Sequence, residues 1–150
     1  MNIQKEICGA FCEGLSIRKV PLGYAIRTPF MWVHGEPLVI FGEAKDGLVR
    51  MRDSGDSLLI LEDLAGDLTT DTKVEAIYEL ATSHGVLFDE EQALFTGGWV
   101  EESMLGEAAI RFMSFLNRLQ DLALLSRDRV VSSFREELTV ALTDHFLRST

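Results

Sequence analysis

Three short turns near the start of the chain restrict its fold more than any other feature of the sequence. The turns are Pro21-Leu22-Gly23, His34-Gly35-Glu36 and Lys45-Asp46-Gly47. They separate four runs that favour strands, at 15–20, 24–33, 37–44 and 48–52. A turn of this length joins antiparallel neighbours, because parallel strands need a crossover of about a dozen residues or more. The first third of the chain is therefore predicted to form an antiparallel meander.

The run at 24–33 combines a proline with large aromatic side chains. Pro29 has no backbone N–H, which predicts that this strand lies at an edge of the sheet or bends at that point. An exposed edge can accept a strand from another chain. Phe30 and Trp32 are therefore candidate partner-binding residues, and packing in the core is the alternative for both.

Helical spacing accounts for most of the remaining sequence. The predicted order is an N-terminal helix, an antiparallel β-meander, two helices, a small β-hairpin and two C-terminal helices, which places the chain in the α+β class. A chain of 150 residues has the length of one ordinary domain. We expect a single domain over 1–150, with an α+β core at 1–102. The helical pair at 103–150 is expected to pack on that core or on a second copy.

The first of these C-terminal helices carries an unusually wide apolar face. Phe112, Phe115 and Leu119 lie on it, and further Met and Leu residues widen it beyond one stripe. A face of this width is buried on two sides, either between the sheet and the last helix or against a second copy. These three side chains are therefore candidate partner-binding residues, and a homodimer is expected.

The charge of the chain is strongly acidic and unevenly distributed. The net charge is −10, and residues 53–102 contain one Lys or Arg against thirteen Asp or Glu. A negative field opposes the approach of phosphates, so direct nucleic-acid binding is not expected. A protein partner is expected instead.

The cysteine content and the apolar runs indicate a reducing, aqueous environment. Cys8 and Cys12 are four residues apart in a predicted helix, where disulfide geometry is poorly met, so we interpret them as buried, reduced thiols. No apolar run reaches the roughly 18 residues of a membrane span, and the first residues do not resemble a signal peptide. A cytoplasmic location without membrane contact is expected.

The junction at 50–66 holds the most enzyme-like cluster of the chain. Arg52, Asp53 and Asp56 follow a predicted strand, and carboxylates in such a place can hold a divalent metal. The alternative is structural: Asp53-Ser54-Gly55 suits a turn, Asp56 or Ser54 can cap the Leu-rich helix that follows, and Gly66 can end it. We favour the structural interpretation. No motif for a cofactor, a zinc site or a nucleophile accompanies the cluster.

Several of these segments together resemble a known family. They are Cys8 and Cys12, Thr28-Pro29-Phe30 followed by Gly35, the junction Arg52-Asp53-Ser54-Gly55-Asp56-Ser57-Leu58 with its helix ending at Gly66, and Phe134-Arg135-Glu136-Glu137. The chain resembles, over most of 8–140, the bacterial family catalogued as domain of unknown function 1828. The resemblance implies single-domain organisation and a bacterial or phage origin. It transfers no catalytic residue.

The sequence therefore predicts a small acidic α+β protein that acts as a protein-binding or chaperone-like module. At the level of fold, the element order and acidity also resemble the small dimeric chaperones of type III secretion. Two alternatives stay open. One is a metal-dependent, nuclease-like enzyme that uses Asp53 and Asp56, and the other is an acidic, phage-related decoy that mimics DNA.

Overall fold

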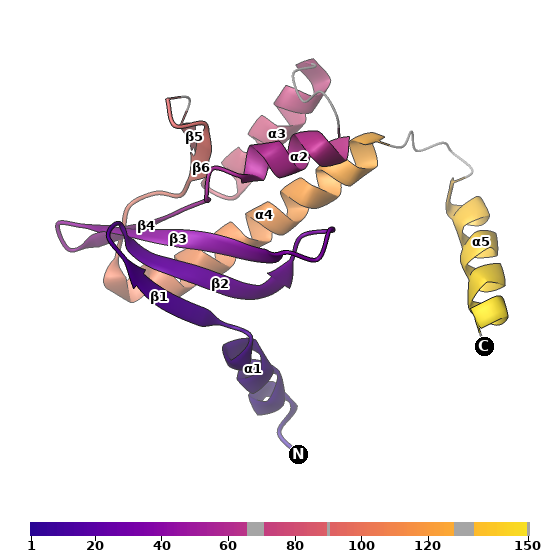
Figure 1. The fold of residues 1–150 in the computed structure, drawn as a ribbon, viewed down its shortest axis with the longest axis horizontal. Coiled ribbons are helices and arrows are strands. Elements are labelled where there is room, and N and C mark those ends of the chain that lie inside the picture. Colours follow the sequence, from indigo (N-terminus) through magenta and orange to yellow (C-terminus); the bar gives the residue numbers. More distant parts are fainter. Residues whose placement is uncertain (66–70, 90, 128–133, 150) are drawn as a thin grey trace.

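The α+β architecture is present in the order that the sequence predicts. The computed structural model describes residues 1–65, 71–89, 91–127 and 134–149 (Figure 1). Its helices are α1 (Ile3–Glu13), α2 (Ser57–Ala65), α3 (Asp71–Ser83), the 3₁₀ turn η1 (Glu102–Met104), α4 (Leu105–Arg127) and α5 (Phe134–Ser149). Its strands are β1 (Ser16–Val20), β2 (Gly23–Met31), β3 (Pro37–Lys45), β4 (Leu48–Arg52), β5 (Leu87–Asp89), β6 (Leu94–Thr96) and β7 (Val100–Glu101). The predicted end of the junction helix at Gly66 lies outside the described residues.

The strands form one antiparallel sheet in the order β1-β2-β3-β4-β6-β5, with β7 also paired to β4. The hairpin between β3 and β4 turns at Asp46 and Gly47, which both have positive φ angles of 52° and 77°. Two successive residues in this conformation match the right-handed twist of a hairpin, which explains the Asp-Gly pair. The predicted meander is confirmed.

Strand β2 is an inner strand over its first half, and it is an edge only at Pro29, where the described strands include no partner on the β1 side. Over Gly23 to Arg27, β2 pairs with β1 on one side and with β3 on the other. The pairing with β1 stops at Arg27, and the register with β3 shifts between Arg27 and Met31. Pro29 falls in this irregular stretch, so its missing N–H breaks no ladder there. The strand is thus irregular at Pro29, and the outermost described strands of the sheet are β1, β5 and β7.

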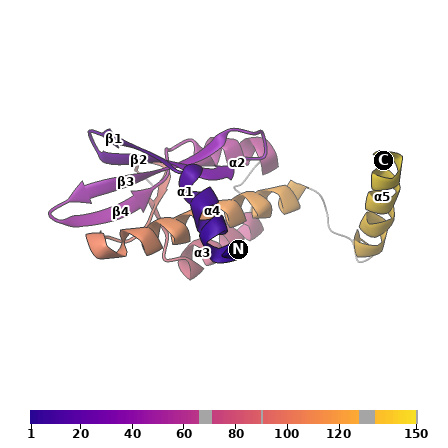
Figure 2. The ribbon, with the colours of Figure 1, turned by 90° about the horizontal axis from the view of Figure 1, so that it is seen from below.

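The core lies between the sheet and α4 (Figure 2). Figure 2 shows β1–β4 on one side, with α4 and α3 on the other. Helix α4 contacts β4 along one face and α2 and α3 along another. The wide apolar face is thus buried on two sides, as expected, but its second cover is α2 and α3 and not the last helix. The largest fully buried side chains include Phe95, Phe112, Phe115, Leu116 and Leu119.

The two terminal helices contribute little to this core. Helix α1 has no buried residue. It meets the sheet near its C-terminal end, where the ring centres of Phe11 and Phe30 are 6.0 Å apart. Figures 1 and 2 both show α5 standing apart from the sheet and from the other helices. Of the expected C-terminal pair, α4 packs on the core, and the described part of α5 lies apart from it. Among the described residues, none of the helices combines the length and apolar character needed to cross a bilayer.

Candidate functional site

Most of the candidate site residues lie on or directly after strand β4. The two faces of this strand and its C-terminal end have different surroundings. Met51 points into the core, and Arg50 and Arg52 lie on the opposite face of the sheet beside Glu43. Asp53 follows the last strand residue directly. The predicted cluster of Arg52, Asp53 and Asp56 therefore spans the end of β4 and the turn before α2.

Asp53 is a fully buried tether between distant parts of the chain. One carboxylate oxygen, Oδ1, accepts a hydrogen bond from the Gly55 backbone N–H at 2.6 Å, and Oδ2 accepts one from the Phe95 N–H at 3.0 Å. The Ser57 side chain also hydrogen-bonds to it. Burial raises the pKa of Asp53, and the Phe95 and Gly55 N–H groups oppose that rise in part. Both carboxylate oxygens are thus engaged by the protein itself.

The other two members of the cluster point elsewhere. Arg52 donates through one terminal nitrogen to Glu43 Oε1 at 3.0 Å, and Asp56 is exposed to solvent. The Ser54 hydroxyl accepts from the Asp56 backbone N–H at 3.3 Å, which continues the turn into α2. In the part of the chain that the structure describes, no three His, Cys, Asp or Glu side chains come together as a metal site. This geometry fits the turn interpretation of the junction.

Glu43 forms the principal charged cluster of the sheet. Its Oε2 accepts a hydrogen bond from Arg50 Nε at 2.9 Å, and its Oε1 accepts one from a terminal nitrogen of Arg52 at 3.0 Å. Burial by itself raises the pKa of Glu43, but the hydrogen bonds and positive charges of Arg50 and Arg52 outweigh burial, so that pKa lies below its ordinary value. The Arg50 guanidinium also stacks over the Trp99 ring, 4.8 Å from its centre.

Replacing Glu43 with glutamine is expected to weaken folding and to flatten its acid dependence. The pKa of Glu43 is lower in the folded than in the unfolded chain, so its stabilisation is complete above its unfolded pKa and is lost as the pH falls through its folded pKa. At pH 7, Glu43→Gln should lower the free energy of unfolding by about 1–3 kcal/mol. Urea titrations at pH 7 and pH 4 should show a smaller difference for the variant than for the wild type. An unchanged difference would contradict this role.

Four of the five predicted partner-binding side chains lie inside the chain's own core. Trp32, Phe112, Phe115 and Leu119 are all buried. The last three lie on α4, which contacts β4, α2 and α3, and the periodicity of a single helix could not identify these neighbours. Phe30 differs, because 39% of it is exposed.

The interpretation of the two cysteines as buried thiols is wrong. Cys8 and Cys12 are free and exposed on α1. Their spacing was consistent with a buried helix face, but α1 has no buried residue and rests on the sheet only near its C-terminal end. The thiols are therefore open to solvent.

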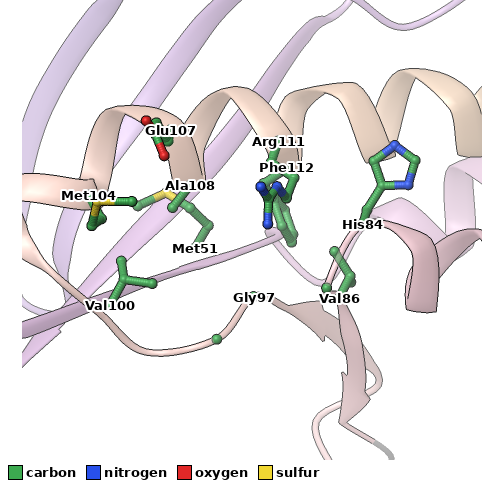
Figure 3. Close-up of a pocket in the computed structure, with 12 residues that line it drawn as sticks. Met51, His84, Val86, Gly97, Val100, Met104, Glu107, Ala108, Arg111 and Phe112 are labelled. Atoms are coloured by element: carbon green, nitrogen blue, oxygen red, sulfur yellow. The ribbon is translucent and has the colours of Figure 1, made fainter.

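A small pocket beside β4 has no counterpart among the predicted sites (Figure 3). Its cavity volume is about 120 Å³. In Figure 3, Met104 of η1 and Ala108 and Phe112 of α4 form one wall, with Val86 and Val100 opposite. An apolar cavity of roughly 150 Å³ can hold a benzene ring, whereas typical cofactor sites start at about 300 Å³. The pocket can therefore hold one apolar side chain of a partner, and not a dinucleotide.

The rim of this pocket is polar. Glu107 and Arg111 lie one turn apart on α4, and His84 closes the other end, with its Nδ1 2.9 Å from the Leu80 carbonyl oxygen. Gly97 and Gly98 also line the pocket and leave room there because they have no side chains. A shallower groove of about 520 Å³ lies between α3 and α4.

The comparisons with known proteins give a family without an assigned activity. The family model described as "Domain of unknown function DUF1828" matches residues 28–119. This match includes the junction and the pocket but not Cys8, Cys12 or 134–137, so it is shorter than the expected resemblance. No curated protein and no solved structure matches the chain. The chain belongs to the DUF1828 family.

Proposed function

We propose that this protein is a cytoplasmic, chaperone-like module that acts by binding another protein chain, and that it works as a homodimer. The observation that carries the proposal is the exposed apolar surface of the two terminal helices. These helices contribute little to the core, so their apolar side chains remain uncovered. Ile3 is 64% exposed and Ile7 is 66% exposed, whereas the facing sides of α4 and the sheet are fully packed. Apolar helix faces of this kind are typical of binding sites for partner chains.

The exposed side chains of α1 are continuous with the tip of β2. Ile3, Ile7 and Phe11 are four residues apart and therefore share one side of the helix. The Phe11 ring meets the Phe30 ring edge to face, and Met31 beyond it is also exposed. We call this surface, formed by Ile3, Ile7, Phe11, Phe30 and Met31, the α1 stripe.

Helix α5 supplies a second apolar side. Leu138, Leu142 and Phe146 are four residues apart and exposed. An isolated helix of 16 residues is marginally stable in water, so its formation is favoured when another surface covers it. The α1 stripe of a second copy offers such a cover, which supports the homodimer.

The test replaces the most exposed part of the α1 stripe and measures assembly. The double variant Ile3→Ser, Ile7→Ser should shift the solution mass from dimer to monomer, because each lost side chain removes about 1.5–3 kcal/mol of apolar burial from an interface that uses it. The melting temperature of the monomeric domain should change little, since neither residue is buried. Light scattering coupled to size exclusion measures the mass.

The matched control is Leu22→Ser, which removes an exposed leucine in the turn between β1 and β2. This variant should keep the mass of the wild type. The proposal would be contradicted by a wild-type chain that is strictly monomeric at high concentration and that also co-purifies with no other protein.

A further inference from the structure

The face of the sheet turned away from α4 is open and positively charged. Figure 1 looks onto this face of β1–β4, and no described helix crosses it there. Directly paired residues of an antiparallel sheet point to the same side, so the strand registers assign the side chains of this face. Four arginines lie on it, namely Arg18, Arg27, Arg50 and Arg52. Glu43 lies among them, and Glu101 on β7, opposite Leu48, lies beside Arg50 on the same face, on a chain whose net charge is −10.

The arginines form two groups, which are separated by apolar residues in the middle of this face. Pairing places Arg18 opposite Ala25, Ala25 opposite Phe41, and Phe41 opposite Arg52. This row crosses four strands with a cation at each end, and Ala25 and Phe41 lie between them. Arg27 lies near Arg18 on the neighbouring strand, and Arg50 lies near Arg52 on the same strand.

The guanidinium groups have hydrogen-bonding capacity to spare. Arg18 and Arg27 are exposed, and within the described residues neither has a hydrogen-bond or ion-pair partner. Arg50 and Arg52 each use one nitrogen on Glu43 and keep other N–H donors, since a guanidinium has five. The Glu43 cluster itself shows that a carboxylate fits between the side chains of this face.

We propose that this face binds an acidic, extended segment of a partner protein, with carboxylates at positions i and i+4 and an apolar side chain at i+2. Neighbouring strands are roughly 4.8 Å apart, so β1 and β4 are separated by about 14 Å. An extended chain advances about 3.3 Å per residue, so four residues span about 13 Å, and positions i, i+2 and i+4 point to one side. The two carboxylates then reach Arg18 with Arg27 and Arg50 with Arg52, and the apolar side chain packs on Phe41, which is half-buried, beside the buried Ala25.

A peptide fits these observations better than a nucleic acid. A polyanion is repelled along its whole length by the acidic remainder of the chain, whereas a segment with two carboxylates is repelled much less. Arginine also pairs with carboxylates through two parallel hydrogen bonds, which suits discrete acidic side chains. This proposal deepens the protein-binding function by naming the chemistry of a partner, on a surface separate from the α1 stripe.

The experiment measures binding of a dye-labelled peptide Gly-Ser-Glu-Gly-Leu-Gly-Glu-Ser-Gly to the full chain by fluorescence anisotropy at low ionic strength. Saturable binding that weakens with added salt is expected. Arg18→Gln should weaken it about tenfold, because it removes hydrogen bonds to a charged group. Lys19→Gln is the matched control, since it makes the same charge change on the same strand but on the other face, and it should leave the affinity unchanged.

Three results would overturn the proposal. One is equal binding of the isomeric peptide in which the two glutamates are adjacent. Another is an equal effect of Arg18→Gln and Lys19→Gln, and the third is binding of an oligothymidylate in place of the peptide. The variant Ile3→Ser, Ile7→Ser should bind the peptide like the wild type, so this proposal and the dimer proposal can fail independently.

Discussion

Replacing Asp53 with alanine is expected to lower the free energy of unfolding by about 2–5 kcal/mol. The change leaves the N–H groups of Gly55 and Phe95 without their partner, in a place where Asp53 itself is fully buried. Each buried donor that loses its acceptor costs roughly 1–3 kcal/mol. The loss should appear in urea denaturation at neutral pH, with the midpoint shifted and the slope unchanged.

Two further variants make this result specific. Asp56→Ala should change stability by less than about 0.5 kcal/mol, because Asp56 is exposed and its carboxylate has no described partner. Asp53→Asn keeps one acceptor oxygen, so it should fall between the wild type and Asp53→Ala. If Asp53→Ala instead kept its stability and lost calorimetric binding of magnesium or manganese, the metal-dependent enzyme would replace the tether as the explanation of this residue.

The junction illustrates what local sequence can and cannot predict. Asp53-Ser54-Gly55 predicted a turn, and the contact between Asp53 and Gly55 is a local bond of that turn. The second bond of Asp53 reaches Phe95, which is 42 residues away in the chain. No spacing rule connects these two positions, so the sequence indicated the turn but not the tether to β6.

The lack of information on long-range contacts also explains which predictions about the apolar helices and strands failed. The width of the α4 face correctly predicted burial on two sides, because amphipathicity is a property of one helix. Which elements supply the cover depends on tertiary packing, and so α2 and α3 were missed as the partners of Phe112 and Leu119. Likewise, Pro29 predicted an irregular strand, but it could not show that the pairing of β2 with β1 stops at Arg27, just before that irregularity.

Replacing Phe115 with alanine is expected to have the largest effect of any single change, a loss of about 3–5 kcal/mol of stability. Phe115 is fully buried. The centre of its ring lies 5.1 Å from the ring centre of Phe95, 6.1 Å from that of Phe112 and 6.0 Å from that of His84. Removing it opens a cavity where α4, the sheet and the end of α3 meet, and a packed interior closes such a cavity only in part. Thermal and urea unfolding of the purified variant measure the loss.

The matched control separates a core residue from an interface residue of the same type. Phe146 on α5 is largely exposed, so Phe146→Ala should change the stability of the domain by less than about 0.5 kcal/mol. In a dimer that covers α5, the same variant should weaken assembly, because an apolar side chain leaves the interface. A Phe115→Ala protein that unfolds like the wild type but no longer assembles would return Phe115 to the partner-binding surface and would contradict the packing of α4 as a buried helix.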